Sequence, residues 1–413
     1  MNIKFRLTVL NFLELFVFGA WLISLGGYLG GQLNFEGIQI GKIFTTLGIA
    51  SVVMPGIIGI IADKYINAQK LLGLLHIIGA IFMFFLAQTK DFDLFFWLIL
   101  GYLTVYMPTL GLANTVSYSI LTTNKFDVIK VFPKIRVWGT IGFIVAEVSV
   151  GTFGWAQSNM QFYFAMVISL IMGVYSFTLP NVPLSTASNK SLLERLGLDA
   201  FVLFKEYKIA VFFIFSTLLG IVLQITNAWA SEFLRSFKET YPDSFAVTNS
   251  NTLIALSQVS ETLFILTIPF FLKRFGIKTV MIMSMMAWFF RFALFGIGSP
   301  EGIGLGYLIL SMVVYGAAFD FFNISGSLFI ETETDTKYRG SAQGLFVLLT
   351  NGVGAIIGGL GSGYIVQLFT TETGRDWFSI WMIFAAYALV LAIIFGLIFK
   401  YKHNPNAIKN VHH

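Results

Sequence analysis

Two polar side chains interrupt a long apolar stretch of the sequence. Gln258 and Glu261 lie within residues 252–272, one helical turn apart. A carboxylate in the middle of a membrane-spanning helix costs about 2.5–3.5 kcal/mol on insertion scales, so such a group normally faces the protein interior or a water-filled cavity. We therefore expect Glu261 to have a cationic partner or to bind a proton.

A cation that could serve as this partner lies at the start of another apolar stretch. Arg136, Thr140 and Phe143 share one face of a helix, and nearby glycines let a neighbouring helix approach closely. Alternatively, Arg136 only extends to the lipid headgroups, since it lies near the start of its span. If it faces Glu261, motion between the two would switch the carboxyl group between the neutral form that burial favours and the charged form that an arginine favours.

Two further stretches bring amides, aromatic rings and an acid into the apolar part of the chain. Gln224 and Asn227 are three positions apart and can donate and accept hydrogen bonds, as hydroxyls and base edges require. Interhelical hydrogen bonding is the alternative role for both. Tyr315 and Phe319 lie one turn apart and are followed by Asp320. The rings could stack on a substrate or simply pack, and Asp320 could bind a proton or form a structural pair.

Together these residue types favour a site for a neutral, polar solute with an aromatic part. Stacking of a nucleobase on an aromatic ring is worth about 1–3 kcal/mol, and the amides and Glu261 would bind hydroxyl groups. The chain has no phosphate-binding loop and no cysteine, and its four histidines form no helical metal-ligand pair. We expect no enzyme activity, no cofactor and no metal, and an ion gradient as the energy source.

The composition is that of a protein that crosses a membrane many times. Of 413 residues, 56% are hydrophobic and 11% are charged, against about 25% charged in a typical soluble domain. Twelve apolar stretches are each long enough to cross a hydrocarbon core of about 30 Å. They cover residues 7–29, 40–62, 71–88, 94–119, 135–156, 161–180, 208–232, 251–272, 278–297, 303–330, 340–368 and 377–399.

A polar connection divides these spans into two sets of six. We expect an all-α membrane protein with an N-terminal six-helix bundle at 1–180, a cytoplasmic linker at 181–207, a C-terminal six-helix bundle at 208–400 and a cytoplasmic tail at 401–413. Of the 26 Lys and Arg residues, 19 fall on one side of the membrane and five on the other, which predicts cytoplasmic termini. Arg136 and Arg291 lie in or beside spans, and Arg291 is expected to pair with an acidic neighbour.

The loop after the second span carries a further pattern. Gly59, Asp63 and Lys64 resemble the Gly-x-x-x-Asp-Arg/Lys loop of the major facilitator superfamily. In that reading Asp63 would cap a helix or pair across a cytoplasmic gate, and Lys64 would stay among the headgroups. The alternative is an ordinary basic loop on the cytoplasmic side.

Longer strings resemble the bacterial nucleoside:proton symporters of the same superfamily. They cover residues 106–112, 135–143, 223–227, 254–271, 315–327 and 341–344. The resemblance implies two pseudo-symmetric six-helix bundles and proton-coupled uptake of nucleosides, such as uridine or adenosine, across the bacterial inner membrane by alternating access. We also expect a monomer that binds no nucleic acid.

The same resemblance implies roles for individual residues. Substrate contacts are expected at Arg136, Thr140, Phe143, Gln224, Asn227, Gln258, Glu261, Tyr315 and Phe319, and proton coupling at Glu261, Arg136 or Asp320. Glu14, Glu147 and Glu232 depart from the family pattern. If any of them lines the cavity, the proton stoichiometry or the substrate range could differ.

Two other interpretations stay open at this point. A sugar:proton symporter of the same superfamily would share the architecture and differ in substrate. A non-transporting membrane receptor would leave the buried Arg136 and Glu261 without a purpose. A membrane-embedded enzyme is the weaker alternative, because the sequence shows no metal-ligand spacing and no activated nucleophile.

Overall fold

The computed structural model describes residues 2–184, 194, 196–372 and 374–401. Parts of the expected linker (185–193 and 195) and nearly all of the expected tail (402–413) therefore lie outside the described residues. The described chain is almost entirely helical, as the apolar runs predict, with one two-stranded hairpin in which β1 (Thr370–Thr371) pairs antiparallel with β2 (Gly374–Arg375).

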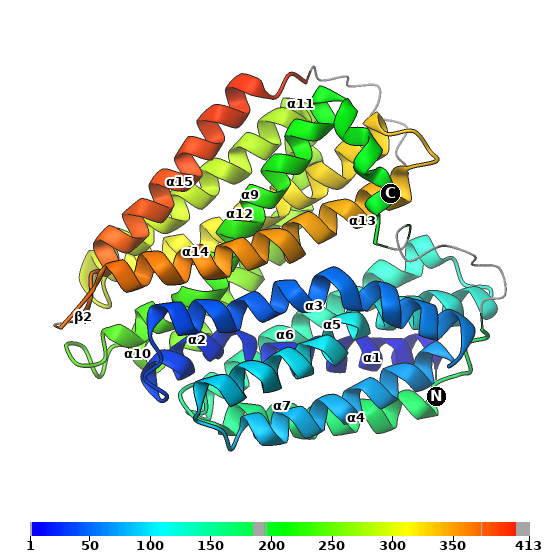
Figure 1. Cartoon of the computed structure of the whole chain (residues 1–413), viewed down its shortest axis with the longest axis horizontal. Helices are drawn as coiled ribbons and strands as arrows, with labels where there is room; N and C mark the ends of the chain where they lie inside the picture. The colour runs from blue at the N-terminus through cyan, green and yellow to red at the C-terminus, as the bar shows by residue number, and fades with distance from the viewer. Residues whose placement is uncertain (1, 185–193, 195, 373, 402–413) are drawn as a thin grey trace.

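The helices fall into two groups that follow each other in the chain (Figure 1). The first group is α1 (Ile3–Gly19), α2 (Leu22–Gly31), α3 (Gly37–Lys64), α4 (Ala68–Leu86), α5 (Phe92–Thr123), α6 (Val128–Thr152) and α7 (Met160–Thr178). After the 3-10 helix η1 (Leu198–Lys205), the second group is α9 (Tyr207–Ser236), α10 (Phe245–Thr248), α11 (Ser250–Ile297), α12 (Gly302–Glu333), α13 (Arg339–Val347), the π-helix η2 (Leu348–Gly354), α14 (Ala355–Leu368) and α15 (Trp377–Ile398).

Twelve membrane spans follow from these helices, as the apolar runs predict. Eleven helical segments of the described chain are long and apolar enough to cross a membrane, and α1 and α2 together form the first. One of the eleven, α11, has 48 residues, which at 1.5 Å per residue is more than twice the thickness of a hydrocarbon core. Its backbone breaks at Gly276, where φ is 77°, a conformation that glycine adopts readily. The helix therefore turns back there and supplies two spans.

The two groups form two bundles that meet along a few helices. In Figure 1 the first bundle lies below the second, and α3 and α14 run side by side between them. The β1–β2 hairpin lies at one end of the molecule, and the start of α1 and the end of α15 lie at the opposite end. We call these the hairpin end and the terminal end.

Glycines bring the backbones of the two bundles into direct contact toward the hairpin end. A methyl group added at Gly41 of α3 would lie 2.4 Å from the carbonyl oxygen of Gly359 in α14. One added at Gly26 of α2 would lie 2.1 Å from the carbonyl oxygen of Ala228 in α9. Because only a residue without a side chain fits at such separations, these glycines fix how closely the bundles approach.

Toward the terminal end, Gly59, Asp63 and Lys64 lie in the last two turns of α3, so this pattern is helical rather than part of a loop. The helix α3 ends at Lys64, and α4 begins four residues later. The start of the linker is held against α4, since Gln69 accepts a hydrogen bond from the backbone N–H of Val182 at 3.1 Å.

Candidate functional site

A cavity of about 400 Å³ lies between the two bundles. This volume is within the range of about 300–1,000 Å³ that is usual for small-molecule sites. Its walls are mostly apolar and come from both bundles: Phe18, Leu22, Leu47, Ser51, Pro55, Met107, Leu110 and Gly111 from the first, and Gly220, Leu223, Gln224, Asn227, Val347, Thr350, Asn351 and Ala355 from the second. Such a lining accepts a largely uncharged ligand and orients it through a few amides.

Two of the residues predicted from the sequence, Gln224 and Asn227, line this cavity. Gln224 also joins the bundles, because its Nε2 donates to the backbone oxygen of Phe44 at 3.2 Å. Asn227 makes no side-chain hydrogen bond within the described part of the chain, so its amide is free to bind a ligand. Asn351, on the π-helix η2, is exposed on the cavity wall. No pattern in the sequence singles out Asn351, although π-helices often occur at functional sites.

A small void next to the cavity contains two more of the predicted residues. Asn227 lines both spaces, and Gln258 and Tyr315 line the void. The void has a volume of only about 10 Å³, near the minimum for one water molecule. In this conformation, a ligand in the cavity therefore reaches Gln258 and Tyr315 only after a small movement of the helices.

Arg291 lies behind Tyr315 and is completely buried. Its Nη1 donates to the backbone oxygen of Ser311 at 2.9 Å, and its guanidinium lies 4.5 Å from the centre of the Tyr315 ring. The expectation that it pairs with an acidic neighbour was wrong: within the described residues no carboxylate lies within ion-pair distance of it. Backbone oxygens, hydroxyls and rings replace the anion. These partners come from three other spans, so no local pattern in the sequence reveals them.

The aromatic pair predicted from α12 forms as a stack. The rings of Tyr315 and Phe319 are nearly parallel, with centres 5.9 Å apart and planes inclined by 2°. Trp288 packs its edge against Tyr315 at 5.7 Å. Phe319 lines a second small void with Asn323, which adjoins the central cavity at Leu223 and Thr350, but Phe319 does not line the cavity itself. The rings therefore stabilise each other in this conformation.

Arg136, Thr140 and Phe143 are half-buried on α6 but line none of these three spaces. Phe143 is one layer behind the cavity wall, with its ring edge-on to that of Phe18 at 6.1 Å. Of the charged groups around Arg136, Glu261 interacts with it most strongly, followed by Glu14. No ion pair joins Arg136 and Glu261 in the described structure, so the two face each other across the bundles without contact.

Asp320, on α12 of the second bundle, is buried. Its Oδ2 has no hydrogen-bond partner in the described structure, and the charge that acts on it most strongly is that of Glu261. Arg136 of the first bundle and Glu261 and Asp320 of the second thus form a group of one cation and two acids that act on one another electrostatically. A proton bound by either acid would relieve the repulsion between them.

Glu147 continues the face of α6 that carries the predicted residues. It lies four positions after Phe143 and is completely buried, and neither of its carboxylate oxygens has a partner within the described residues. One turn further, a methyl group at Gly151 would lie 3.0 Å from the Cβ of Asn251 on α11. Glu147 therefore lies between the site and a close contact of the two bundles.

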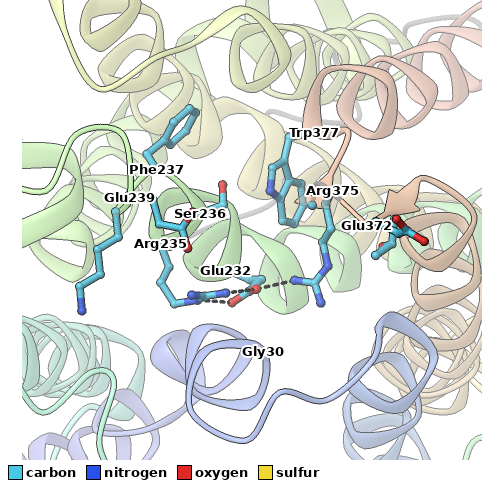
Figure 2. A pocket seen from close by; sticks show the side chains of 12 residues that line it. Gly30, Glu232, Arg235, Ser236, Phe237, Glu239, Glu372, Arg375 and Trp377 are labelled. Carbon is cyan, nitrogen blue, oxygen red and sulfur yellow. Dashed lines mark hydrogen bonds and ion pairs between the residues drawn. The ribbon is translucent and has the colours of Figure 1, made fainter.

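The hairpin end is closed by a buried ion cluster (Figure 2). Glu232, which is 1% exposed, accepts hydrogen bonds from Arg235 at 2.8 and 2.6 Å and from Arg375 of β2. A methyl group added at Gly30 of α2 would lie 2.5 Å from this carboxylate. The cluster therefore packs directly on the first bundle, beside a surface pocket of about 660 Å³.

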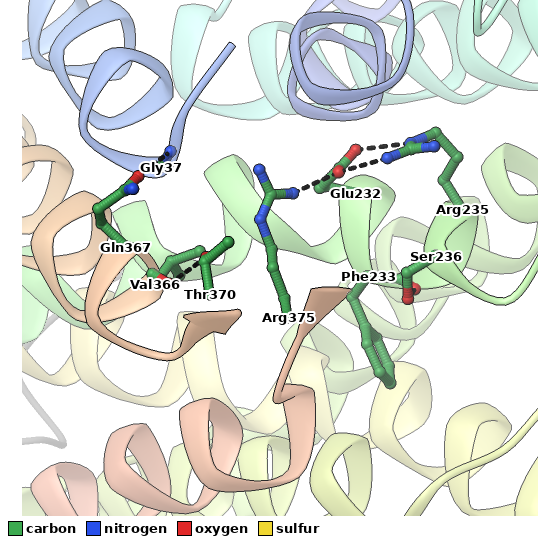
Figure 3. A network of polar contacts seen from close by, with 9 residues as sticks. All are labelled: Gly37, Glu232, Phe233, Arg235, Ser236, Val366, Gln367, Thr370 and Arg375. Carbon is green, nitrogen blue, oxygen red and sulfur yellow. Dashed lines mark hydrogen bonds and ion pairs between the residues drawn. The ribbon is translucent and has the colours of Figure 1, made fainter. Parts of the chain in front are cut away.

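A second polar contact crosses between the bundles at the same end (Figure 3). The backbone N–H of Gly37 donates to the Oε1 of Gln367 at 2.9 Å. The departures at Glu147 and Glu232 thus belong to the closed end, and neither lines the central cavity.

Comparison with known proteins identifies relatives over nearly the whole chain. The family model described as nucleoside H⁺ symporter matches residues 1–404. The xanthosine permease of Escherichia coli K12 is 48% identical over 413 residues, covering 99% of both chains, and the nucleoside permease NupG of the same organism is 48% identical over the full length of both. A crystal structure of nucleoside transporter NupG has a TM-score of 0.92 and 48% identity, covering 97% of this chain and 100% of that chain.

Proposed function

Because the chain belongs to the nucleoside H⁺ symporter family, we propose that it carries nucleosides such as uridine or adenosine into the cell together with protons, without changing them chemically. The observation that carries this proposal is the cavity between two bundles whose described residues pack closely toward the hairpin end. A site between two such bodies can open to one side of the membrane and then to the other as they rock.

The charge distribution gives the orientation that we propose. The terminal end carries most Lys and Arg residues and faces the cytoplasm, and the hairpin end faces the outside of the bacterial inner membrane. The bundles are in contact toward the hairpin end, so the structure represents the conformation closed to the outside. The units that move are residues 1–180 and 208–400, joined by the linker 181–207, and the cavity lies within a single chain, which is consistent with a monomer.

Substrate binding rests on the amides and rings around the cavity. Asn227 and Gln224 would bind the ribose hydroxyls or the base edge, because a carboxamide both donates and accepts. Rocking of the bundles would bring Gln258 and Tyr315 against the substrate, since the void between them adjoins the cavity at Asn227. Phe143, Thr140 and Phe319 would complete the site after this movement.

Proton coupling rests on the group of Arg136, Glu261 and Asp320. Glu261 would bind a proton when it is away from Arg136 and release it when the two approach, because a cation favours the ionised carboxylate. Asp320 would either share this proton or keep Glu261 protonated by repulsion. We further propose that Gly59, Asp63 and Lys64 form part of the cytoplasmic gate.

Uptake by the purified protein in proteoliposomes tests the function. With an inward proton gradient, labelled uridine should accumulate above its external concentration, and collapse of the gradient by a protonophore should abolish accumulation. Unlabelled adenosine should compete, whereas a disaccharide should not. Competition by the disaccharide alone would instead favour a sugar symporter, and the absence of any uptake would favour a non-transporting receptor.

A further inference from the structure

A closed polar network is buried inside the first bundle, away from the cavity. It joins Glu14 of α1, His76 of α4, Thr109 of α5 and Ser169 of α7, which are 3%, 1%, 0% and 0% exposed. The Nε2 of His76 lies 3.0 Å from Oε2 of Glu14, and its Nδ1 lies 3.1 Å from the hydroxyl of Ser169. In the sequence, Glu14 departs from the family pattern, but nothing there connects it to His76, which is 62 residues away.

The network contains more short contacts than hydrogens to fill them. Besides the two contacts of His76, the Ser169 hydroxyl lies 2.9 Å from the backbone oxygen of His76. The Thr109 hydroxyl lies 2.6 Å both from Oε1 of Glu14 and from the backbone oxygen of Tyr106. Each of these five contacts joins two electronegative atoms and is favourable only with a hydrogen between them.

With Glu14 ionised and His76 neutral, the two hydroxyls and the imidazole supply one hydrogen each. Three hydrogens fill five contacts only if both hydroxyl hydrogens are shared between two acceptors. With one added proton there are four hydrogens for the five contacts, and only the hydroxyl hydrogen of Thr109 is still shared between two acceptors. In a site that water does not reach, a contact without a hydrogen is costly, so the geometry favours binding of a proton.

The position of this proton follows from Ser169. Its single hydrogen points to the backbone oxygen of His76, which has no hydrogen of its own, so the hydroxyl accepts from Nδ1 of the ring. With Nδ1 protonated, the contact between Nε2 and Glu14 needs one more hydrogen. Either an imidazolium faces a carboxylate or a neutral imidazole accepts from a carboxylic acid, and both forms contain the same added proton.

Among the groups around Glu14 and His76, the cation Arg136 links this pair to the transport site. Tyr106 of α5 donates its hydroxyl to the backbone oxygen of Glu14 at 2.9 Å, and Tyr102 lies behind it. On α6, Arg136 is within the field of Glu14 as well as that of Glu261. From α7 the pair is faced by Ser169, which has no charge. A proton on the pair therefore removes a negative charge that competes with Glu261 for Arg136.

We propose that Glu14 and His76 form a second proton-binding site, which is occupied in the conformation closed to the outside and contributes a proton to transport. The proposal deepens the proposed function and, for its transport part, rests on it. Filling and emptying of the site would require α1 to move against α4 and α5 within the first bundle, a local rearrangement in addition to the rocking of the two bundles. Phe18, one turn further along α1, lines the cavity, so a bound nucleoside acts on the same helix.

The first test reads the proton directly and does not depend on transport. The chain has only four histidines, so ¹⁵N-histidine NMR of the full-length protein, with His76→Gln to identify the signal, reports the protonation of both ring nitrogens. Nδ1 should carry a hydrogen, and at neutral pH the signals should show the added proton shared with Glu14. In Glu14→Gln, Nδ1 should keep its hydrogen and the added proton should be lost. A His76 ring that is neutral and protonated only at Nε2 would overturn the proposal.

The second test measures the number of protons that enter with each uridine in proteoliposomes. Glu14→Gln should lower this ratio by about one and should flatten the pH dependence of uptake, while Glu301→Gln, an exposed acid at the start of α12, should change neither. An unchanged ratio in Glu14→Gln would overturn the proposal even if the NMR signal shows the proton. If the unmodified protein takes up no uridine, the proposed function fails, and the NMR result alone then decides whether the pair binds a proton.

Discussion

The contact of α3 and α14 gives a sharp prediction about the conformational equilibrium. A methyl group at Gly41 would lie 2.4 Å from the carbonyl oxygen of Gly359, whereas ordinary contacts begin at 3.4 Å. Gly41→Ala thus requires the helices to separate by about 1 Å. Overpacking of this kind costs about 1–3 kcal/mol. If the bundles separate at this end in the other conformation, only the closed state is destabilised, and the equilibrium shifts by about 5- to 150-fold.

A single introduced cysteine can measure this shift, because the chain contains none. Ser231 is 1% exposed and packs on Gly27 of the opposite bundle, where a methyl group would lie 2.6 Å from its hydroxyl oxygen. In Ser231→Cys, a membrane-impermeant maleimide should therefore react only when the hairpin end opens. Adding Gly41→Ala should raise the labelling rate by about 5- to 150-fold.

The matched control is Gly361→Ala in the same helix as Gly359, since nothing lies within 4 Å of a methyl group there. This variant should label at the unmodified rate. Equal labelling rates with and without Gly41→Ala, in a protein that stays folded and monodisperse, would refute the reasoning. An increase in the labelling rate by Gly361→Ala as large as that caused by Gly41→Ala would also refute it.

Three further predictions concern charged side chains away from the cavity. Glu232→Gln should lower the melting temperature and increase opening of the hairpin end, because breaking a buried ion pair costs about 3–5 kcal/mol. Glu239→Gln, at an exposed position, should do neither. Equal melting temperatures for the two variants would contradict this prediction. Arg291→Leu should weaken uridine binding, measured by isothermal titration, by releasing the ring of Tyr315, and unchanged affinity would argue against a positioning role. Asp376 is the N-terminal cap of α15, and hydrogen bonds from Ser379 lower its pKa. Its stabilising effect is therefore present above the usual pKa of an aspartate and is lost as the pH falls through the lowered pKa. Asp376→Asn should remove this contribution to the fall of the melting temperature in acid.

The architecture could be predicted from the sequence because it depends on the lengths of apolar runs. The runs predicted at 251–272 and 278–297 correspond to the two arms of α11, and Gly276 at the break lies in the connection between them. Helix ends differ by a few residues, as at α6, which begins at Val128 rather than 135. Polar residues such as Asp127, which caps α6, can extend a helix beyond its apolar part.

The site was predictable residue by residue only where family-like strings occur, and the roles given to those residues stay predictions. Gln224 and Asn227 line the cavity, but Gln258 and Tyr315 lie beside it and Arg136 is near Glu261 without contact. Which of them touches the cavity depends on the position of the two bundles, and local spacing does not encode that position.

The networks that sequence analysis missed are those whose members are far apart in the chain. Glu14 meets a histidine from α4, Arg291 meets oxygens and rings from other spans, and Glu232 meets the arginine of the β hairpin. Each of these residues is unusual by itself in an apolar segment, and that signal is visible in the sequence. The identity of the partner is a property of the packed helices.

Uphill uptake by Glu261→Gln tests the central claim most directly. In proteoliposomes with an inward proton gradient, the unmodified protein should concentrate labelled uridine. Glu261→Gln should lose this accumulation, because no proton can be bound and released at that position. Accumulation by Glu261→Gln at the unmodified rate and to the unmodified level would contradict the account.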